Sequence, residues 1–471
     1  MRYVSTRGGA SATFEEALLL GLAPDGGLFV PEAWPELGAE GIRRLAGRPY
    51  KDVALEVIAP FVGDSFARAE LEAILAETYA TFDTALVAPL VQIAPADFLV
   101  ELFHGPTFAF KDVALQLVAR LYERVLRRNK GRLTIVCATS GDTGSAAIEA
   151  VRGREGMEIF VLFPEGRVSD IQRKQMTTAA EKNVHVFAVA GTFDDCQRIV
   201  KELFADRAFA EATSLTGVNS INWARIVAQA VYYVTSALAL GAPDRGVSFA
   251  VPTGNFGDVY AGYVAARMGL PIRRLLVATN ANDILVRTLE TGAYEKRGVV
   301  ATSSPSMDIE VASNFERLVF EVLDRDASAT RALFSGLSQS GAFTLPGHAR
   351  ERIGELFWAA RASEAEVARA IAEIHKATGH LLDPHTAVGA VALQKARLAG
   401  SIGAGETAIV LATAHPAKFP EAVARAAGLT PIVPPRLAGV LTRPERCLPV
   451  PPDTGAVKSA IRSAIGWRAS L

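Results

Sequence analysis

The spacing of hydrophobic and polar positions changes near residue 98 of this 471-residue chain. Before that point, apolar residues recur every three or four positions in segments 14–20, 53–61 and 66–79. This period is typical of amphipathic helices. After it, short apolar runs alternate with helical segments, as they do in a parallel α/β sheet. The pattern therefore predicts a mostly helical N-terminal module over residues 1–96, followed by α/β structure.

The α/β part contains six apolar runs that we interpret as strands, most of them followed by a loop and a helix. A later stretch, residues 315–376, lacks strong strand patterns and predicts helices at 314–323, 349–361 and 364–376. The six predicted strands are 133–138, 158–163, 184–189, 247–251, 275–278 and 408–412.

These patterns predict four consecutive domains. The N-terminal module is followed by a smaller α/β domain over residues 97–215. A larger α/β domain over residues 216–430 contains the helical insertion near 315–376. The proline-rich segment 431–471 is expected to wrap over the surface.

Composition narrows the class of protein. Half of the residues are hydrophobic, so a chain of this length can bury more than one core. The 49 basic and 50 acidic residues give a net charge of -1, which offers no electrostatic footprint for nucleic acid or an anionic membrane. The longest apolar helix candidate, 228–240, is too short to span a bilayer. We therefore expect a soluble protein that binds a small molecule.

Three widely separated cysteines, Cys137, Cys196 and Cys447, suit a reducing compartment better than a disulfide framework. A cytoplasmic location follows as an expectation. The sequence leaves the oligomeric state open between a monomer and a homodimer.

Lys111 is the first candidate for chemistry. It follows a Gly-Pro turn and lies beside Phe108 and Phe110 at the predicted start of a helix. Aromatic neighbours remove hydration, which disfavours the ammonium form and leaves the nucleophilic amine that Schiff-base chemistry needs. This stretch alone gives equal weight to a structural alternative, in which the stem covers apolar surface and the charge stays in water.

A glycine-containing loop follows the predicted strand 247–251. Backbone N–H groups that converge at a helix N-terminus form a site for phosphate. A plain tight turn is the structural alternative. The candidate residues are Gly254, Asn255, Phe256, Gly257 and Asp258.

A second polar loop follows the predicted strand 133–138, where its amides and hydroxyls could bind a substrate carboxylate. Helix N-capping by Ser140, Asp142 or Thr143 would explain the same residues without a ligand. The loop consists of Thr139, Ser140, Gly141, Asp142 and Thr143.

Thr413 ends the predicted strand 408–412, where a neutral hydroxyl could bond a ring nitrogen, with His415 and Lys418 as possible helpers. Arg225 and Lys174, with Arg173, are candidates for binding a phosphorylated substrate, although for each one taken singly a surface role is the better explanation.

No metal site is expected. The most closely spaced histidines, His375, His380 and His385, lie five residues apart and are interrupted by Gly379 and Pro384. They therefore do not share a helix face.

A lysine flanked by aromatic residues, a glycine loop for phosphate and a hydroxyl for a pyridine nitrogen match the three anchoring needs of pyridoxal 5'-phosphate. With these residues in place, the chain resembles the threonine synthase family, in its longer bacterial and fungal form. The motifs that carry the resemblance occur in order over nearly the whole chain, at residues 3–8, 24–31, 104–116, 139–146, 252–258, 304–309 and 413–419.

The resemblance implies a fold type II pyridoxal-phosphate enzyme, similar to the tryptophan synthase β chain, with two parallel-type α/β sheets and the helical N-terminal module. It implies conversion of O-phospho-L-homoserine and water into L-threonine and phosphate.

It also implies roles for individual residues. Lys111 would bind the cofactor as a Schiff base and shuttle protons, and Thr413 would face the pyridine nitrogen. The loop around Gly254 would hold the cofactor phosphate, and residues 140–143 the substrate carboxylate. Asp142 departs from the asparagine that is usual in related enzymes, which leaves its contact with the cofactor open.

Two alternatives remain at this stage. A threonine or serine dehydratase has the same fold, but its lysine is typically found in Ser-Phe-Lys, whereas this chain has Ala109-Phe110-Lys111. A catalytically inactive relative that binds a metabolite is the non-enzymatic alternative, although it would have no chemical need of Lys111.

Overall fold

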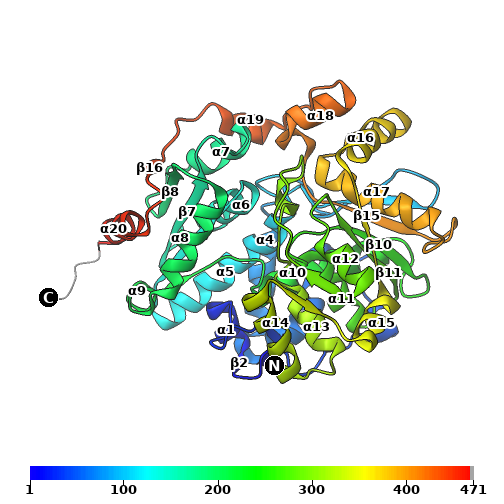
Figure 1. The fold of residues 1–471 in the computed structure, drawn as a ribbon, viewed down its shortest axis with the longest axis horizontal. Coiled ribbons are helices and arrows are strands. Elements are labelled where there is room, and N and C mark those ends of the chain that lie inside the picture. Colours follow the sequence, from blue (N-terminus) through cyan, green and yellow to red (C-terminus); the bar gives the residue numbers. More distant parts are fainter. Residues whose placement is uncertain (467–471) are drawn as a thin grey trace. The chain divides into compact units, whose positions relative to one another are not determined.

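The computed structural model describes residues 1–466, which form two compact units (Figure 1). Unit 1 combines Met1–Ala114 with Ser220–Ile432. Unit 2 combines Leu115–Asn219 with the chain from Val433 onward. Each unit is therefore built from two separate stretches of sequence. The division into four consecutive domains cuts the chain differently and stays a prediction.

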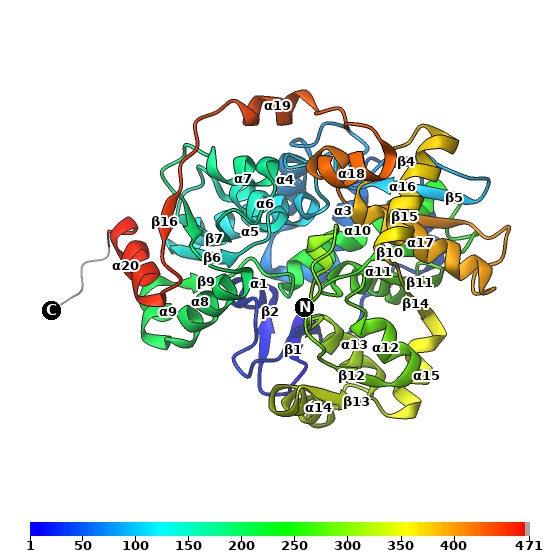
Figure 2. The same cartoon turned by 45° about the horizontal axis from the view of Figure 1, so that its top comes forward.

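Unit 1 is built on a six-stranded sheet of order β14-β11-β10-β15-β5-β4, whose strands are all labelled in Figure 2. Every neighbouring pair is parallel except β4 and β5, so the carboxyl ends of five strands share one edge. The strands are β4 (Leu90–Gln92), β5 (Asp97–Glu101), β10 (Val247–Pro252), β11 (Ile272–Thr279), β14 (Phe357–Arg361) and β15 (Ala408–Ala412).

Helix α17 (Pro384–Leu398) packs against this sheet, and α16 (Glu364–Thr378) packs on α17 and completes the core over this apolar face of the sheet. Both begin at side-chain caps, because Ser363 accepts the N–H of Glu366 and Asp383 accepts the N–H groups of His385 and Thr386. Unit 1 also contains α10 (Trp223–Ala239), α11 (Gly257–Arg267), α12 (Ile284–Thr291) and α18 (Pro420–Ala427), and its N-terminal region contains the short helix α2 (Gly38–Arg43).

The N-terminal region contains the three predicted helices, α1 (Phe14–Leu20), α3 (Tyr50–Val62) and α4 (Arg68–Tyr79). The prediction of a mostly helical region is confirmed, and a three-stranded antiparallel sheet of order β2-β1-β3, which was not predicted, is present as well. Strands of three or four residues are too short to show an alternating pattern clearly. They are β1 (Arg2–Ser5), β2 (Ser11–Thr13) and β3 (Phe29–Pro31).

The predicted helix over residues 349–361 is wrong in its last five residues. Helix α15 (Gly347–Leu356) ends at Leu356, and the next five residues form edge strand β14, which pairs with β11. Pairing with the sheet overrides local helix propensity here. The rest of this region is helix-rich as expected, with one small antiparallel pair: α13 (Phe315–Val322), α14 (Ala327–Ser340), β12 (Ala293–Glu295) and β13 (Ala342–Thr344).

Unit 2 contains a five-stranded, all-parallel sheet of order β16-β8-β7-β6-β9. The two predicted parallel-type sheets are therefore both present. C-terminal strand β16 (Leu448–Val450) extends this sheet, and α20 (Thr454–Ala464) packs on α8 (Phe193–Ala205), so the proline-rich segment contributes to a core. The strands are β6 (Leu133–Ala138), β7 (Met157–Pro164), β8 (Val184–Val189), β9 (Leu215–Thr216) and β16 (Leu448–Val450).

The first helix with residues in unit 2 is α5, which starts at Lys111 in unit 1 and ends at Asn129. No helix within residues 1–466 is both long enough and apolar enough to cross a bilayer. The other helices of unit 2 are α6 (Asp142–Val151), α7 (Asp170–Thr177), α8 (Phe193–Ala205), α9 (Arg207–Thr213), α19 (Pro435–Leu441) and α20 (Thr454–Ala464).

The close approach of α17 to the sheet gives a test of the packing in unit 1. A Cβ atom on Gly389 would lie 2.8 Å from Val410 Cγ1 and 3.2 Å from Pro252 Cγ. Both neighbours are stiff, so we expect Gly389→Ala to lower the free energy of unfolding by about 1–3 kcal/mol in urea titrations. Gly354→Ala is the matched helical control, because no atom lies within 4 Å of its added Cβ. It should be neutral or stabilising by about 0.5–1 kcal/mol. Equal effects of the two substitutions would contradict this packing argument.

Candidate active site

Lys111 is the first residue of α5 and is held in place by its neighbours. The backbone N–H and hydroxyl of Thr107 donate to the Asp112 carboxylate at 2.7 and 2.8 Å, which fixes the turn before the helix. Lys111 is only 7% exposed, and its Nζ lies 3.4 Å from Ser306 Oγ and 4.9 Å from the centroid of the Phe110 ring. This burial excludes the alternative of a solvated surface lysine.

The loop after β10 approaches other backbone segments so closely that its sequence is constrained. A Cβ on Gly254 would lie 2.8 Å from the carbonyl oxygen of Ser306. Phe256 adopts a left-handed conformation (φ 63°) immediately before α11, and the Asn255 carbonyl accepts the N–H of Asn314 at 3.0 Å. The first N–H groups of a helix have no partner within it, so the start of α11 at Gly257 presents donors suited to phosphate.

Thr413 lies at the end of β15, and its main chain connects it to the lysine segment. Its carbonyl oxygen accepts the N–H of Phe110 at 2.8 Å, and its own N–H donates to Thr386 Oγ1 at 3.2 Å. Ser306 meanwhile contacts both Lys111 and the Gly254 loop. Unit 1 therefore brings together the three segments that the sequence analysis singled out for the cofactor.

His415 and Lys418 hold this arrangement from the Thr413 side. The Lys418 ammonium is fully buried and donates to the Thr107 carbonyl at 2.9 Å. His415 accepts the N–H of Ala417 through Nδ1 at 3.1 Å. Burial lowers the pKa of His415 to about 4, so its ring is neutral at neutral pH. Both residues make structural contacts.

Asp258 lies in the first turn of α11, where its carboxylate accepts hydrogen bonds from the hydroxyls of Tyr232 and Tyr233 on α10. Burial raises the pKa of Asp258 to about 7, against the opposing effects of the two hydroxyls and of the Lys111 charge. Since the carboxylate binds these tyrosines, the group that Asp258 could offer to a phosphate is its backbone N–H.

The second polar loop lies in unit 2, between β6 and α6. The hydroxyl of Thr139 accepts the N–H groups of Gly141 and Gly144, both at 2.9 Å, and Gln172 donates to the Asp142 carboxylate at 3.0 Å. The alternative of N-capping by Ser140, Asp142 or Thr143 is wrong, because the N-cap residue is Gly141, which has no side chain, and the hydroxyl that binds the first turn of α6 belongs to Thr139. The side chains of Ser140 and Thr143 are partly exposed, whereas Asp142 is buried.

The two candidates for a substrate phosphate lie in different units. Arg225 is in the first turn of α10 in unit 1 and is only 4% exposed. Lys174 is on α7 in unit 2, and its ammonium donates to the carbonyl of Leu441 at the end of α19, at 2.5 Å. A cation at a helix C-terminus is favourable in itself, so this contact gives Lys174 a structural role.

Four residues around Lys111 were missed as site residues. Ser306 lies in a 3₁₀ turn, Pro305–Met307, and accepts a hydrogen bond from the lysine. Asp383, His385 and Thr386 lie at the start of α17, where His385 contacts Ser306, Thr386 contacts Thr413, and the Asp383 carboxylate accepts hydrogen bonds from both. The Asp-Pro sequence at 383–384 is a recognisable helix start, but contacts across 79 residues leave no mark in the local pattern.

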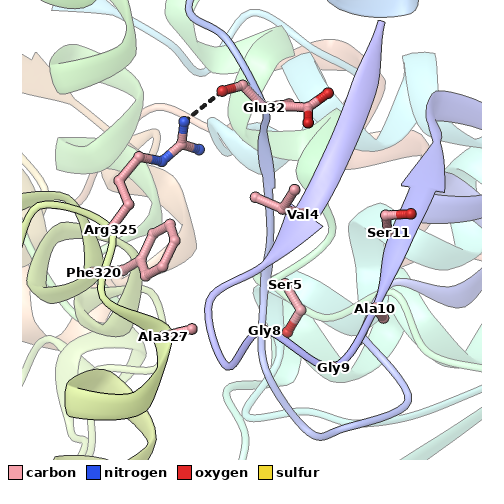
Figure 3. Close-up of a pocket in the computed structure, with 10 residues that line it drawn as sticks. All are labelled: Val4, Ser5, Gly8, Gly9, Ala10, Ser11, Glu32, Phe320, Arg325 and Ala327. Carbon is pink, nitrogen blue, oxygen red and sulfur yellow. Dashed lines mark hydrogen bonds between the residues drawn. The ribbon is translucent and has the colours of Figure 1, made fainter.

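A surface cavity of about 580 Å³ lies elsewhere in unit 1, beside the N-terminal sheet (Figure 3). Its lining contains one arginine, Arg325, whose guanidinium donates to the backbone carbonyls of Pro31 and Glu32. None of the predicted site residues lines this cavity. The lining contains no lysine, and the Arg325 guanidinium is already hydrogen-bonded to main-chain carbonyls.

The residues of unit 1 fit pyridoxal phosphate on structural grounds. Lys111 is a buried amine, the Gly254 loop approaches the Ser306 backbone too closely to accept a Cβ, and the start of α11 supplies phosphate donors. A family model described as "Pyridoxal-phosphate dependent enzyme" matches residues 88–414. A threonine deaminase structure from Solanum lycopersicum shares this fold, with a TM-score of 0.52 at 13% identity over 82% of this chain and 93% of that one. The protein is a pyridoxal-phosphate-dependent enzyme of fold type II.

Two further family models, "Threonine synthase N terminus" and "Threonine synthase, C-terminal", match residues 2–79 and 386–461. The threonine synthase of Pseudomonas aeruginosa is 48% identical over 463 residues, which cover 98% of each chain. A pyridoxal-phosphate-bound threonine synthase structure from Brucella melitensis has a TM-score of 0.95 at 52% identity, covering 98% of this chain and 99% of that one. The yeast threonine synthase structure has a TM-score of 0.93 at 38% identity over 99% of both chains. The chain belongs to the threonine synthase family.

The raised pKa of Asp258 predicts a specific pH dependence of stability. The folded protein binds this proton more tightly than the unfolded chain, whose carboxyl titrates near 3.8. The resulting stabilisation is fully present below about pH 4 and is lost as the pH rises through about 7. We expect urea unfolding of wild type to lose roughly 1 kcal/mol per pH unit across this window relative to Asp258→Asn. Parallel curves for the two proteins would show that Asp258 titrates normally.

The Gly254 approach predicts the effect of one added methyl group. In Gly254→Ala the new Cβ meets a backbone oxygen of Ser306, which cannot rotate away, so the loop must shift. We expect the Kd for pyridoxal phosphate, measured by absorbance titration, to rise about tenfold or more. Gly405→Ala is the control, because its Cβ would meet nothing within 4 Å. Unchanged affinity in Gly254→Ala would remove this loop from the cofactor site.

Proposed function

We propose that this protein converts O-phospho-L-homoserine and water into L-threonine and phosphate. The observation that carries the proposal is the convergence of a buried Lys111, the Gly254 loop and Thr413 in unit 1 of a chain that belongs to the threonine synthase family. Family membership supports the reaction, and the buried amine supports the cofactor chemistry.

Each cofactor residue then has a distinct task. Lys111 holds the cofactor through its amine. The N–H groups at residues 254–258 bind the cofactor phosphate, aided by the positive end of α11. Thr413 offers a neutral hydroxyl to the pyridine nitrogen, which keeps that nitrogen largely unprotonated. When bound, pyridoxal phosphate supplies an electron sink for negative charge that develops on the substrate.

Substrate binding is assigned to groups of matching charge. The N–H groups and hydroxyls of Thr139, Ser140, Gly141, Asp142 and Thr143 suit a carboxylate, since a turn rich in donors stabilises an anion. Arg225 and Lys174 are the proposed partners of the substrate phosphate, because a dianion needs fixed cations. Lys174 also donates to the Leu441 carbonyl, so its ammonium would have to leave that contact or share it to bind the phosphate.

The reaction moves protons on neighbouring carbons while phosphate leaves Cγ and water adds at Cβ. Lys111 is the group assigned to remove the Cα proton and to return a proton later, because a primary amine on a four-carbon stem reaches more than one carbon. Its burial keeps bulk water from the amine. Ser306 Oγ, at 3.4 Å from Nζ, limits where the amine rests between transfers.

We further propose a cytoplasmic location. Cys137, Cys196 and Cys447 are all free thiols, and two of them are buried. Free cysteines of this kind are typical of reducing compartments.

The test begins with the absorption spectrum of wild type and of Lys111→Ala. We expect a band at about 410–430 nm in the wild type that Lys111→Ala lacks, together with a loss of phosphate release of about 10²–10⁴-fold. Lys51→Ala, which removes an exposed lysine, is the control and should keep both signals.

The substrate is decided by two assays on the wild type. Phosphate release from O-phosphohomoserine with no keto acid from threonine supports the proposal. The reverse result would make the protein a dehydratase, and absence of any band after addition of pyridoxal phosphate would refute the cofactor assignment.

A further inference from the structure

The Asp383 carboxylate in unit 1 is fully buried and accepts four hydrogen bonds from the start of α17. Its Oδ1 accepts the backbone N–H and the ring Nδ1 of His385, both at 2.9 Å. Its Oδ2 accepts the backbone N–H of Thr386 at 3.3 Å and the Thr386 hydroxyl. Two of these bonds cap the helix, and the other two orient side chains.

The His385 ring has a defined tautomer. The backbone N–H of Ser306 lies 3.2 Å from Nε2, and a backbone N–H can only donate. Nε2 must therefore be the acceptor, which places the ring proton on Nδ1, where it is donated to Asp383. The neutral Nδ1–H form of His385 thus holds the Ser306 backbone, and Ser306 Oγ in turn contacts Lys111 Nζ.

Thr386 forms the second connection. Its hydroxyl proton is donated to Asp383, so its lone pairs are left to accept the N–H of Thr413 at 3.2 Å. One carboxylate therefore fixes the donor and acceptor roles of both His385 and Thr386. These two residues contact two different segments of the proposed cofactor site, at Ser306 and at Thr413.

We propose that Asp383 is a positioning residue of the active site. Its carboxylate sets the His385 tautomer and the Thr386 hydroxyl direction, and through them the placement of Ser306 beside Lys111 and of Thr413. This inference rests on the proposed function for its catalytic meaning, but the hydrogen-bond roles belong to the folded chain itself.

Helix capping alone does not explain the residue. Asp326 also caps α14 with two bonds, from the N–H groups of Ser328 at 2.9 Å and Ala329 at 3.0 Å, yet it is exposed, and the one hydroxyl that it receives, from Thr330, binds its backbone carbonyl and not its carboxylate. Asparagine caps helices about as well as aspartate. Asp→Asn at the two positions therefore removes the same charge from two caps, and only at 383 does it replace an acceptor by an NH₂ donor facing His385 or Thr386.

The experiment compares holoenzymes of wild type, Asp383→Asn and Asp326→Asn. Tautomers are read from ¹⁵N NMR of the seven histidines, with His385 assigned by its absence in His385→Gln. We expect Nδ1–H for His385 in wild type and Asp326→Asn, and a change of tautomer or a mixture in Asp383→Asn. The Kd for pyridoxal phosphate should rise about tenfold to a hundredfold only in Asp383→Asn. An Nε2–H tautomer in wild type, or wild-type tautomer and Kd within twofold in Asp383→Asn, would overturn the proposal.

A second pair keeps the test decisive if Asp383→Asn does not fold. Thr386→Ser retains the hydroxyl and should keep the wild-type affinity for pyridoxal phosphate. Thr386→Val removes the hydroxyl and should weaken that binding. Equal affinities for these two variants would count against the proposal. Neither the His385 tautomer nor the Kd for pyridoxal phosphate depends on the substrate. A wild type that fails to release phosphate from O-phosphohomoserine would therefore refute the proposed function, whereas the tautomer and the Kd would still test the role of Asp383.

Discussion

The active site depends on the adjacency of three parallel strands, β10, β15 and β5, in the sheet of unit 1. Parallel strands end at the same edge, so the segments that follow them must meet there. These segments carry the Gly254 loop, Thr413 and, ten residues after β5, Lys111. The hydrogen bond from Phe110 to the Thr413 carbonyl is a direct consequence of this strand order. A different strand order would separate Lys111 from Thr413, the proposed partner of the ring nitrogen, whatever the local motifs.

The charged side chains at this edge of the sheet are buried, which changes their chemistry and costs free energy. Lys111, Lys418, Asp258 and Asp383 all lie at positions that are less than a tenth exposed. A buried charge is stable only when other groups compensate it. The compensation differs from residue to residue: Lys418 donates to a carbonyl, Asp383 accepts four hydrogen bonds, and Asp258 responds with a raised pKa. The site is therefore held by hydrogen bonds whose partners cannot be exchanged freely.

Many strands and part of the candidate site could be predicted from the sequence, because they depend on features of a single short segment. Strands such as 133–138, 184–189 and 408–412 were predicted with their observed bounds, because a buried parallel strand is a continuous apolar run. Lys111 and the Gly254 loop also depend on local features, a Gly-Pro turn and glycines at a helix start. The helix predicted over residues 349–361 was partly wrong because strand β14 forms by pairing with β11, a tertiary contact. The N-terminal strands were not predicted because they are too short to show an alternating pattern.

The missed residues show where local analysis ends. His385 was considered only as a metal ligand, because spacing is the property that a sequence displays, whereas its role depends on Ser306, 79 residues earlier. Ser306 in turn touches a lysine 195 residues away. Such contacts are set by where separate chain segments arrive at the sheet edge, and only then do hydrogen-bond rules become informative. Once the Ser306 N–H is placed against Nε2, the tautomer of His385, the proton on Nδ1 and the need for an acceptor at Asp383 follow without further assumption. The long-range contacts thus join residues that show no local motif into a hydrogen-bond network in which every donor points toward the Asp383 carboxylate.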